Sequence, residues 1–220
     1  MRKIKPAEDE IYHVFNRGVD GRAIFKQQAD LERFFDGLNN LNTIESVGHL
    51  ARCRNPVSTR KLVELIAYDL NPNHFHLILK QIAERGIERY MHRLSVSHSK
   101  YFNLKYSRVG TLFQGRFKAI LVDTNDYLLH LSVYVNLNDR AHARGGKLKL
   151  SKSSWEEYVG EVREEFCAKS IILDQFKNKK EYRKFAEKTL KHIIDRKISL
   201  EELKNGESND MSKPGFDTKT

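Results

Sequence analysis

The chain has 220 residues, a length typical of one domain with a small addition, and no run of about 18 apolar residues that would span a membrane. Its basic N-terminus is not followed by the apolar stretch of a signal peptide, and two cysteines exclude a disulfide framework or a cysteine-rich zinc site, so we expect a reducing, cytoplasmic location and no membrane partner. The net charge of +10 favours an anionic partner, most commonly nucleic acid; the alternative is a basic surface with no partner.

The first 80 residues predict a strand, a helix and a hairpin. In the helix, Leu31, Phe34, Phe35 and Leu38 recur at the spacing of a face turned to a core. The turn residues Asn71-Pro72-Asn73 separate the two hairpin strands. The predicted elements are a strand at 12–15, a helix at 28–42, and strands at 63–70 and 74–80.

The next 60 residues predict a helix, a basic loop, a strand and a final helix that Thr124 or Asn125 would cap. The resulting order, βαββαβα, begins with the ferredoxin-like βαββαβ pattern, so we expect an α+β fold. Its four-stranded sheet would have two helices on one face and an open second face. The predicted elements are a helix at 86–101, a loop at 105–115, a strand at 116–122 and a helix at about 125–136.

The chain after these elements changes in composition. Gly145-Gly146 resembles a linker, and Tyr182, Phe185 and Leu190 lie in a later helical stripe. The polar end has the composition of a disordered segment. We therefore expect a main domain at 1–144, a helical appendage at 145–204 that packs back on it, and a disordered tail at 205–220.

His74-Phe75-His76 is the most informative short motif. Residues i and i+2 of a strand face the same side, so both imidazoles would project together while Phe75 enters the core. The pair is near enough to share a cation. The alternative is two ordinary polar residues on an exposed strand.

Tyr134 and Asn138 add two more candidate groups. Their separation of four residues would place them on one helical face. The amide oxygen of Asn138 suits a hard divalent ion, and a phenol such as that of Tyr134 is a known type of covalent nucleophile. A core aromatic is the alternative for Tyr134.

Four ordered motifs carry a family resemblance over about residues 10–160. They are YHVFNRG at 12–18, LNPNHFHL at 70–77, GTLFQGRF at 110–117, and DYLL at 126–129 continuing to YVNLN at 134–138. This string resembles the single-tyrosine HUH transposases, and in particular the REP-associated tyrosine transposases. The segment SSWEEY at 153–158 resembles an element that follows the catalytic domain in that subgroup.

The resemblance implies a function and a set of roles. His74, His76 and Asn138 would bind a divalent metal, Mg²⁺ or Mn²⁺, and Tyr134 would attack DNA to form a 5′-phosphotyrosine link. The substrate would be single-stranded DNA with a hairpin, and the enzyme would be a monomer or a homodimer. The usual proline after the asparagine is Asp139 here, which removes no catalytic atom.

A basic segment between Glu84 and Lys118 is expected to bind the DNA backbone. We take Tyr101, Phe102 and Tyr106 as candidates for base stacking, with core packing as the alternative. Two other functions stay open, namely a hairpin-binding protein that does not cleave and an RNA-binding module, although the aromatic signature of the latter is absent. The predicted DNA contacts are Arg17, Tyr106, Arg108, Arg116 and Lys118.

Overall fold

The computed structural model describes residues 6–45, 60–142, 150–160 and 166–210. Its centre is one antiparallel sheet with the strand order β4-β1-β3-β2-β5. The first four strands confirm the predicted ferredoxin-like pattern, and β5 is an addition at the edge of β2. The strands are β1 (Ile11–Arg17), β2 (Val63–Asn71), β3 (His74–Gln81), β4 (Lys118–Leu121) and β5 (Lys152–Ser153).

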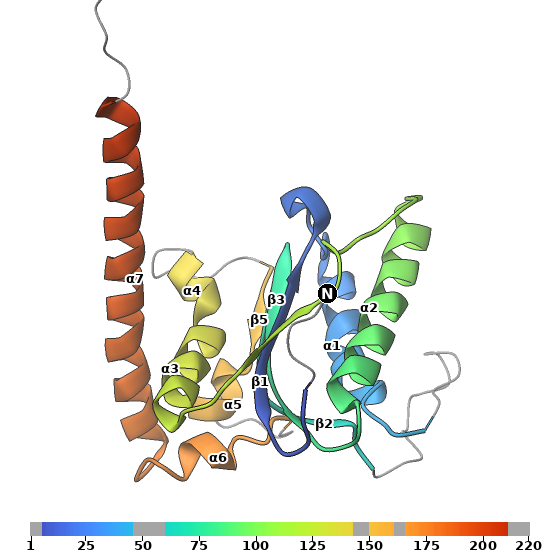
Figure 1. The fold of residues 1–220 in the computed structure, drawn as a ribbon, viewed down its shortest axis with the longest axis horizontal. Helices are drawn as coiled ribbons and strands as arrows, with labels where there is room; N and C mark the ends of the chain where they lie inside the picture. The colour runs from blue at the N-terminus through green and yellow to red at the C-terminus, as the bar shows by residue number, and fades with distance from the viewer. Residues whose placement is uncertain (1–5, 46–59, 143–149, 161–165, 211–220) are drawn as a thin grey trace, which may run out of the picture.

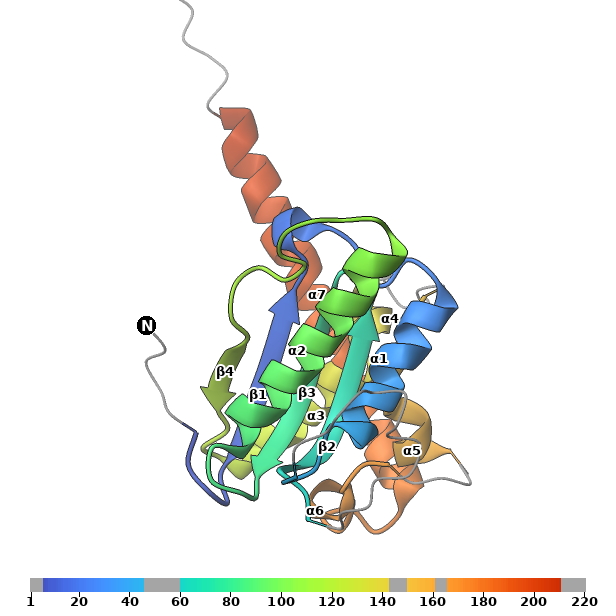
Figure 2. The same ribbon diagram turned by 90° about the vertical axis from the view of Figure 1, so that its right-hand side faces the viewer.

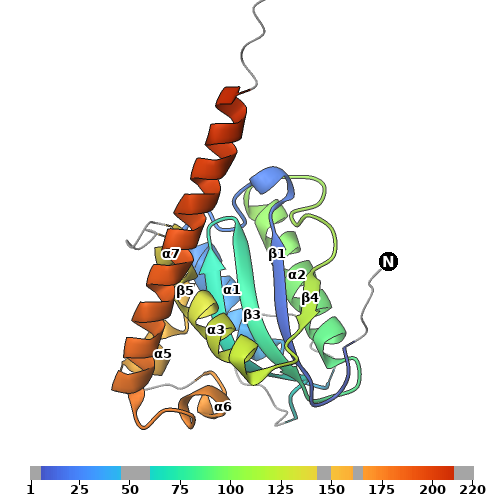
Figure 3. The same cartoon turned by 60° about the vertical axis from the view of Figure 1, so that its left-hand side comes forward.

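Helices lie on both sides of this sheet (Figure 1). Figure 2 shows α1 and α2 in front of the strands, and Figure 3 shows α3 and the long α7 on the opposite side. None of the helices in the described ranges is long and apolar enough to cross a membrane. The helices are a short 3-10 turn η1 (Val19–Gly21), α1 (Gln28–Asn40), α2 (Gly86–Lys105), α3 (Asn125–Asn136), α4 (Asn138–His142), α5 (Trp155–Val159), α6 (Ser170–Leu173) and α7 (Lys179–Asp210).

Two apolar clusters form because neighbouring side chains of a strand alternate between the faces of the sheet. Phe75 and Leu77 of β3 point into the first cluster, with α1 and α2, and are fully buried there. Ile78, from the same strand, packs in the second cluster with α3, α5 and α7. The prediction of an open second face is therefore wrong for most of the sheet, because these helices cover it.

The segment after residue 150 shares the second cluster with the sheet. Tyr182 of α7 is buried, and its hydroxyl bonds to Ser132 Oγ at 3.1 Å and accepts from Asn136 Nδ2 at 2.9 Å. Ser154 Oγ donates to Asn136 Oδ1 at 2.5 Å. The helical segment thus packs against α3, as expected.

The predicted linker at 145–146 and the chain end at 211–220 lie outside the described residues. A disordered tail was predicted from residue 205, but the backbone of α7 continues as a helix to Asp210.

The last predicted helix, at about 125–136, is α3, and a separate short helix follows it. α3 starts as expected, since Thr124 Oγ1 accepts the backbone N–H of Tyr127 at 3.2 Å. It ends at Asn136, because Leu137 leaves the helical conformation with φ −122° and ψ 19°. Asn138 then begins α4. Tyr134 and Asn138 consequently do not share one continuous helix, and their proximity depends on the break at Leu137.

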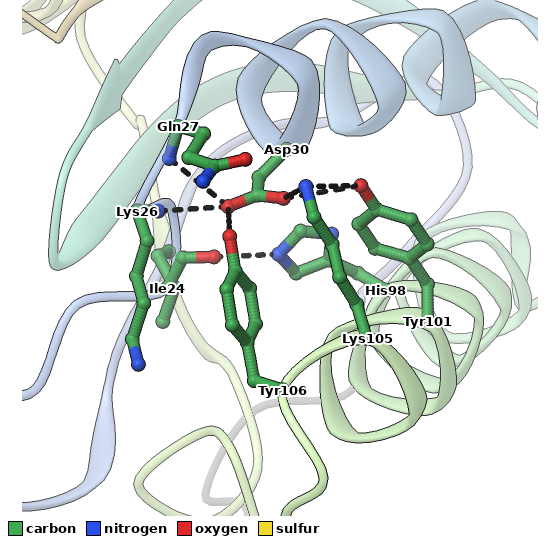
Figure 4. A network of polar contacts seen from close by, with 8 residues as sticks. All are labelled: Ile24, Lys26, Gln27, Asp30, His98, Tyr101, Lys105 and Tyr106. Atoms are coloured by element: carbon green, nitrogen blue, oxygen red, sulfur yellow. Dashed lines mark hydrogen bonds and ion pairs between the residues drawn. The ribbon is translucent and has the colours of Figure 1, made fainter.

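A buried carboxylate, Asp30, ties the start of α1 to the end of α2 (Figure 4). Oδ2 accepts the backbone N–H groups of Lys26 and Gln27 and the hydroxyl of Tyr106, at 2.9, 3.1 and 2.7 Å. Oδ1 accepts from Lys105 Nζ at 2.6 Å and from the Tyr101 hydroxyl at 3.1 Å. Burial opposes the charge, but these donors, led by Lys105, lower the pKa of Asp30 to about 2.

We predict that Asp30→Asn lowers the free energy of unfolding at pH 7 by about 1–2 kcal/mol. The folded-state pKa is below the unfolded one, so this contribution is present above about pH 4 and is lost as the pH falls towards 2. Urea unfolding at pH 7 and pH 2.5 should show a difference between variant and wild type that shrinks in acid. The control is Asp20→Asn, at an exposed carboxylate, which should change stability by less than about 0.5 kcal/mol. A difference that is equal at both pH values would contradict the prediction.

We also predict that truncation after Gly146 yields an insoluble or loosely packed protein. The shortened chain would leave the apolar side of α3 and of β2 without Tyr158, Ile172 and Tyr182, which are fully buried against them. Size-exclusion chromatography and near-ultraviolet circular dichroism check the outcome. A monodisperse product with native near-ultraviolet signal would show that the first 146 residues complete their own core.

Candidate active site

The two histidines of the predicted motif lie on β3, the central strand of the sheet, between β1 and β2. His76 is opposite Phe15 of β1 and Asp69 of β2, and His74 is opposite Arg17 and Asn71. The centroids of the two imidazole rings are 5.2 Å apart. Both point away from the first cluster, while Phe75 enters it, as the strand alternation predicted.

His13 of β1 is a third imidazole that sequence reasoning missed. Its Nε2 shares a hydrogen bond of 2.9 Å with His76 Nδ1, and the two rings stack with centroids 5.1 Å apart. Burial lowers the pKa of His13 to about 4, so the ring is neutral at neutral pH. This hydrogen bond to Nδ1 fixes the orientation of the His76 ring. The residue is visible in the sequence, within YHVFNRG, but only the pairing of β1 with β3 brings it to His76.

His74 is held from the other side. Asn73 Oδ1 accepts from His74 Nδ1 at 2.7 Å, which leaves the lone pair on Nε2. That nitrogen faces the amide groups of two asparagines, with Nδ2 of Asn71 at 3.1 Å and Nδ2 of Asn138 at 3.2 Å. The structure therefore brings His74 and Asn138 together as predicted.

Tyr134 of α3 reaches the same place from above the sheet. The centroid of its ring is 5.3 Å from that of His76 and 6.3 Å from that of His13, in both cases edge to face. The side chain is half-buried. Burial raises the pKa of Tyr134, and the nearby charge of Asp69 raises it further, so the phenol keeps its proton at neutral pH in the resting protein.

Asp69 is a second residue that the sequence reading did not single out. Its side chain is fully buried on β2, and Oδ2 accepts from Asn71 Nδ2 at 2.5 Å and from Asn138 Nδ2 at 2.8 Å. Burial raises the pKa of Asp69 well above its usual range, although the hydrogen bond from Asn138 acts in the opposite direction. A cation placed nearby would favour the charged form.

The donor set fits a hard divalent metal. In the described part of the chain no three His, Cys, Asp or Glu side chains converge to hold a metal, so a site here needs an amide oxygen beside the histidines. Asn138 Oδ1 has the required chemistry, because it is buried and has no hydrogen-bond donor among the described residues. Two imidazoles and an amide oxygen suit Mg²⁺ or Mn²⁺ better than a closed thiolate-rich zinc site does.

A cleft of about 940 Å³ opens beside the histidines. Arg17 and Lys118, two of the predicted DNA contacts, line it together with His74 and His76. Gly18 lets the backbone turn here, since a Cβ would lie 2.0 Å from the carbonyl oxygen of Arg22. Two cationic side chains thus share a cleft with the candidate metal ligands.

The other predicted DNA contacts lie elsewhere. Arg116 lines a separate cleft of about 700 Å³ beside α2, and Arg108 bonds to Asn103 Oδ1 at 3.1 Å at the end of that helix. The hydroxyl of Tyr106 is bonded to Asp30. Of the aromatic residues considered for base stacking, Phe102 is buried in the first cluster, where the core alternative holds.

A third cleft, of about 710 Å³, lies between α1, β5 and α5. Ser153 and Trp155 of the SSWEEY segment line it, and the predicted catalytic and DNA-binding residues do not. The segment therefore builds a surface on the far side of β2 from the histidines.

The comparisons with known proteins agree with this geometry. A family model described as "Transposase IS200 like" matches residues 40–138, a range that contains His74, His76, Tyr134 and Asn138. One similar solved structure is described as "Structure of the REP associates tyrosine transposase bound to a REP hairpin". It has a TM-score of 0.52 at 11% identity, covers 72% of this chain and 86% of that chain, and at this identity shows a shared fold. No curated protein sequence matches the chain.

The family match therefore spans the strand with both histidines and the helix with the tyrosine, and the similar structure has the same fold. Residues 40–138 are thus similar to the IS200-like transposases, and the chain shares its fold with a REP-associated tyrosine transposase.

Proposed function

We propose that this chain cleaves and rejoins single-stranded DNA next to hairpins, through a 5′-phosphotyrosine intermediate and with a divalent metal. One observation carries the proposal. The side chains of four residues from three elements gather beside a basic cleft: His74 and His76 from β3, Tyr134 from α3 and Asn138 from α4. The family match over residues 40–138 supports a transposase, and the hairpin substrate is the one bound by the similar structure.

In the proposed reaction Tyr134 is the nucleophile. Its Oη forms a bond to the phosphorus of a phosphodiester, and the bond from phosphorus to the 3′ oxygen breaks. The phenol proton is lost to water, and the departing 3′ oxygen gains a proton. The 3′-hydroxyl group of a second end then attacks the phosphorus and loses its proton, the bond from phosphorus to Tyr134 Oη breaks, and the tyrosine oxygen takes up a proton, so that a phosphodiester is restored. One ester replaces another, so no external energy is needed.

The surrounding residues prepare this attack. A divalent metal, when bound, supplies positive charge that orients a non-bridging phosphate oxygen and offsets the charge developing in the transition state. His74, His76 and Asn138 would hold it. His13 keeps the ring of His76 in place, and burial keeps the Tyr134 phenol protonated until the substrate arrives.

Arg17 and Lys118 would bind the DNA backbone in the same cleft. Both side chains are exposed, and Lys118 Nζ lies 5.9 Å from the centre of the Phe15 ring. Their charges would offset the phosphates that approach Tyr134.

We predict that Tyr134→Phe lowers cleavage of a single-stranded hairpin DNA by more than about a thousandfold and leaves DNA affinity unchanged. The substitution removes the attacking oxygen and no charge. Covalent adducts separated by denaturing electrophoresis, followed by mass spectrometry, should place DNA on Tyr134. Tyr127→Phe, on the same helix, is the control and should cleave like wild type. An adduct on a different tyrosine would contradict the assignment.

We predict that His76→Ala abolishes Mn²⁺-dependent cleavage while hairpin binding in chelator persists. The matched control is His130→Ala, whose side chain is half exposed and pairs with Asp126 at 3.6 Å. Cleavage is measured over a Mn²⁺ series and binding by fluorescence anisotropy. Normal cleavage by the His76 variant would refute the metal role. Binding without cleavage by the wild type in every metal would favour a hairpin-binding protein that does not cut.

A further inference from the structure

Three residues that share hydrogen bonds, two at the end of β2 and one at the start of α4, each have a buried oxygen without a hydrogen-bond donor in the described structure. These oxygens are Oδ1 of Asp69, Oδ1 of Asn71 and Oδ1 of Asn138, and none has a donor among the described residues. Buried acceptors are normally satisfied, so such a group of oxygens calls for a positive ligand. All three belong to residues that contact His74 or its neighbours.

The hydrogen bonds of Asp69 explain why the two amide oxygens have no donor. Asp69 Oδ2 accepts from the amides of both asparagines, at 2.5 Å from Asn71 Nδ2 and 2.8 Å from Asn138 Nδ2. A carboxylate can only accept, so each amide turns its NH₂ group to Asp69 and its oxygen elsewhere. The same contacts keep both amide groups within 3.2 Å of His74 Nε2. One buried carboxylate thus orients the two amides next to a candidate metal ligand.

Asp69 is paired with the two amides and not with a cationic side chain. Within the described residues it forms no ion pair with a lysine, arginine or histidine, and its side chain is fully buried. Because no three His, Cys, Asp or Glu side chains converge in the described chain, Asp69 lies outside the set of atoms that would touch a metal with both histidines.

We propose that Asp69 is a positioning residue for the metal site: it holds the amide of Asn138 beside His74. This inference rests on the proposed function, because it assumes the site formed by His74, His76 and Asn138. Residues that hold metal ligands in place typically change metal affinity 10–100-fold when they are replaced. Asn71 is the second amide held by the same carboxylate.

The test is Mn²⁺ binding to the full chain by isothermal titration calorimetry, without DNA. Asp69→Asn keeps the size of the side chain and removes its charge, and the dissociation constant for Mn²⁺ should rise by about 10–100-fold. The matched control is Asp139→Asn, a neighbouring buried carboxylate that accepts from Ser151 and from the backbone of Arg140. This control should weaken Mn²⁺ binding clearly less than Asp69→Asn does: the charge of Asp139 acts on Asp69, but Asp139 makes no hydrogen bond to Asn71 or to the Asn138 amide in the described structure.

Activity adds a second readout. If Asp69 positions the ligands and does not act on DNA, saturating Mn²⁺ should restore most of the cleavage rate of Asp69→Asn. An unchanged dissociation constant in this variant, or an equal weakening in Asp139→Asn, would overturn the proposal. Asp69→Ala is the second variant, and failure of both variants to fold would also overturn it by showing a structural role.

His74→Ala separates this inference from the function on which it rests. If His74→Ala binds Mn²⁺ like wild type, the metal site itself is wrong and the proposed function fails. If His74→Ala loses Mn²⁺ binding and Asp69→Asn retains wild-type affinity, the metal site stands and the role of Asp69 is refuted.

Discussion

The pairing of β3 with β1 on one side and β2 on the other is the constraint from which the site follows. Strand alternation sends Phe75 into the cluster under α1 and α2 and turns His74 and His76 to the opposite face. The two neighbouring strands then bring His13 and Asp69 alongside His76. A slip of one residue in either register would turn the imidazoles into the core and the phenylalanine out of it.

Packing on the second face decides where the tyrosine stands. α3 packs on the sheet through the second apolar cluster. The Tyr182 hydroxyl of α7 stabilises this position by hydrogen bonds to Ser132 and Asn136 of α3. These contacts lie on the turns of α3 next to Tyr134. The break at Leu137 then turns Asn138 towards Asp69 and His74. Tyr134 is therefore positioned by residues that come later in the chain than the whole ferredoxin-like unit.

Burial sets the charge state of the site. It keeps His13 neutral, holds the proton on Tyr134 and disfavours the charge of Asp69. The positive charges at the cleft, Arg17 and Lys118, are exposed. Under the proposed function, the buried acceptors would face the metal ion and the exposed cationic cleft would face the phosphate backbone. The Asp30 network, in contrast, has its cation in place and serves to join two helices.

The sequence by itself determined three local features: the β-strand with two histidines on one face, the helix that carries Tyr134, and the βαββαβ order of elements. It could do so because hydrophobic periodicity and turn residues act over short distances along the chain. The family motifs supplied the expected roles of His74, His76, Tyr134 and Asn138. Only the tertiary structure decided that His13 and Asp69 join them, since strand register is a long-range property that periodicity does not encode. It also decided that helices cover the second face of the sheet and that Tyr106 bonds to Asp30, because burial depends on what packs against a residue and not on its neighbours in the chain.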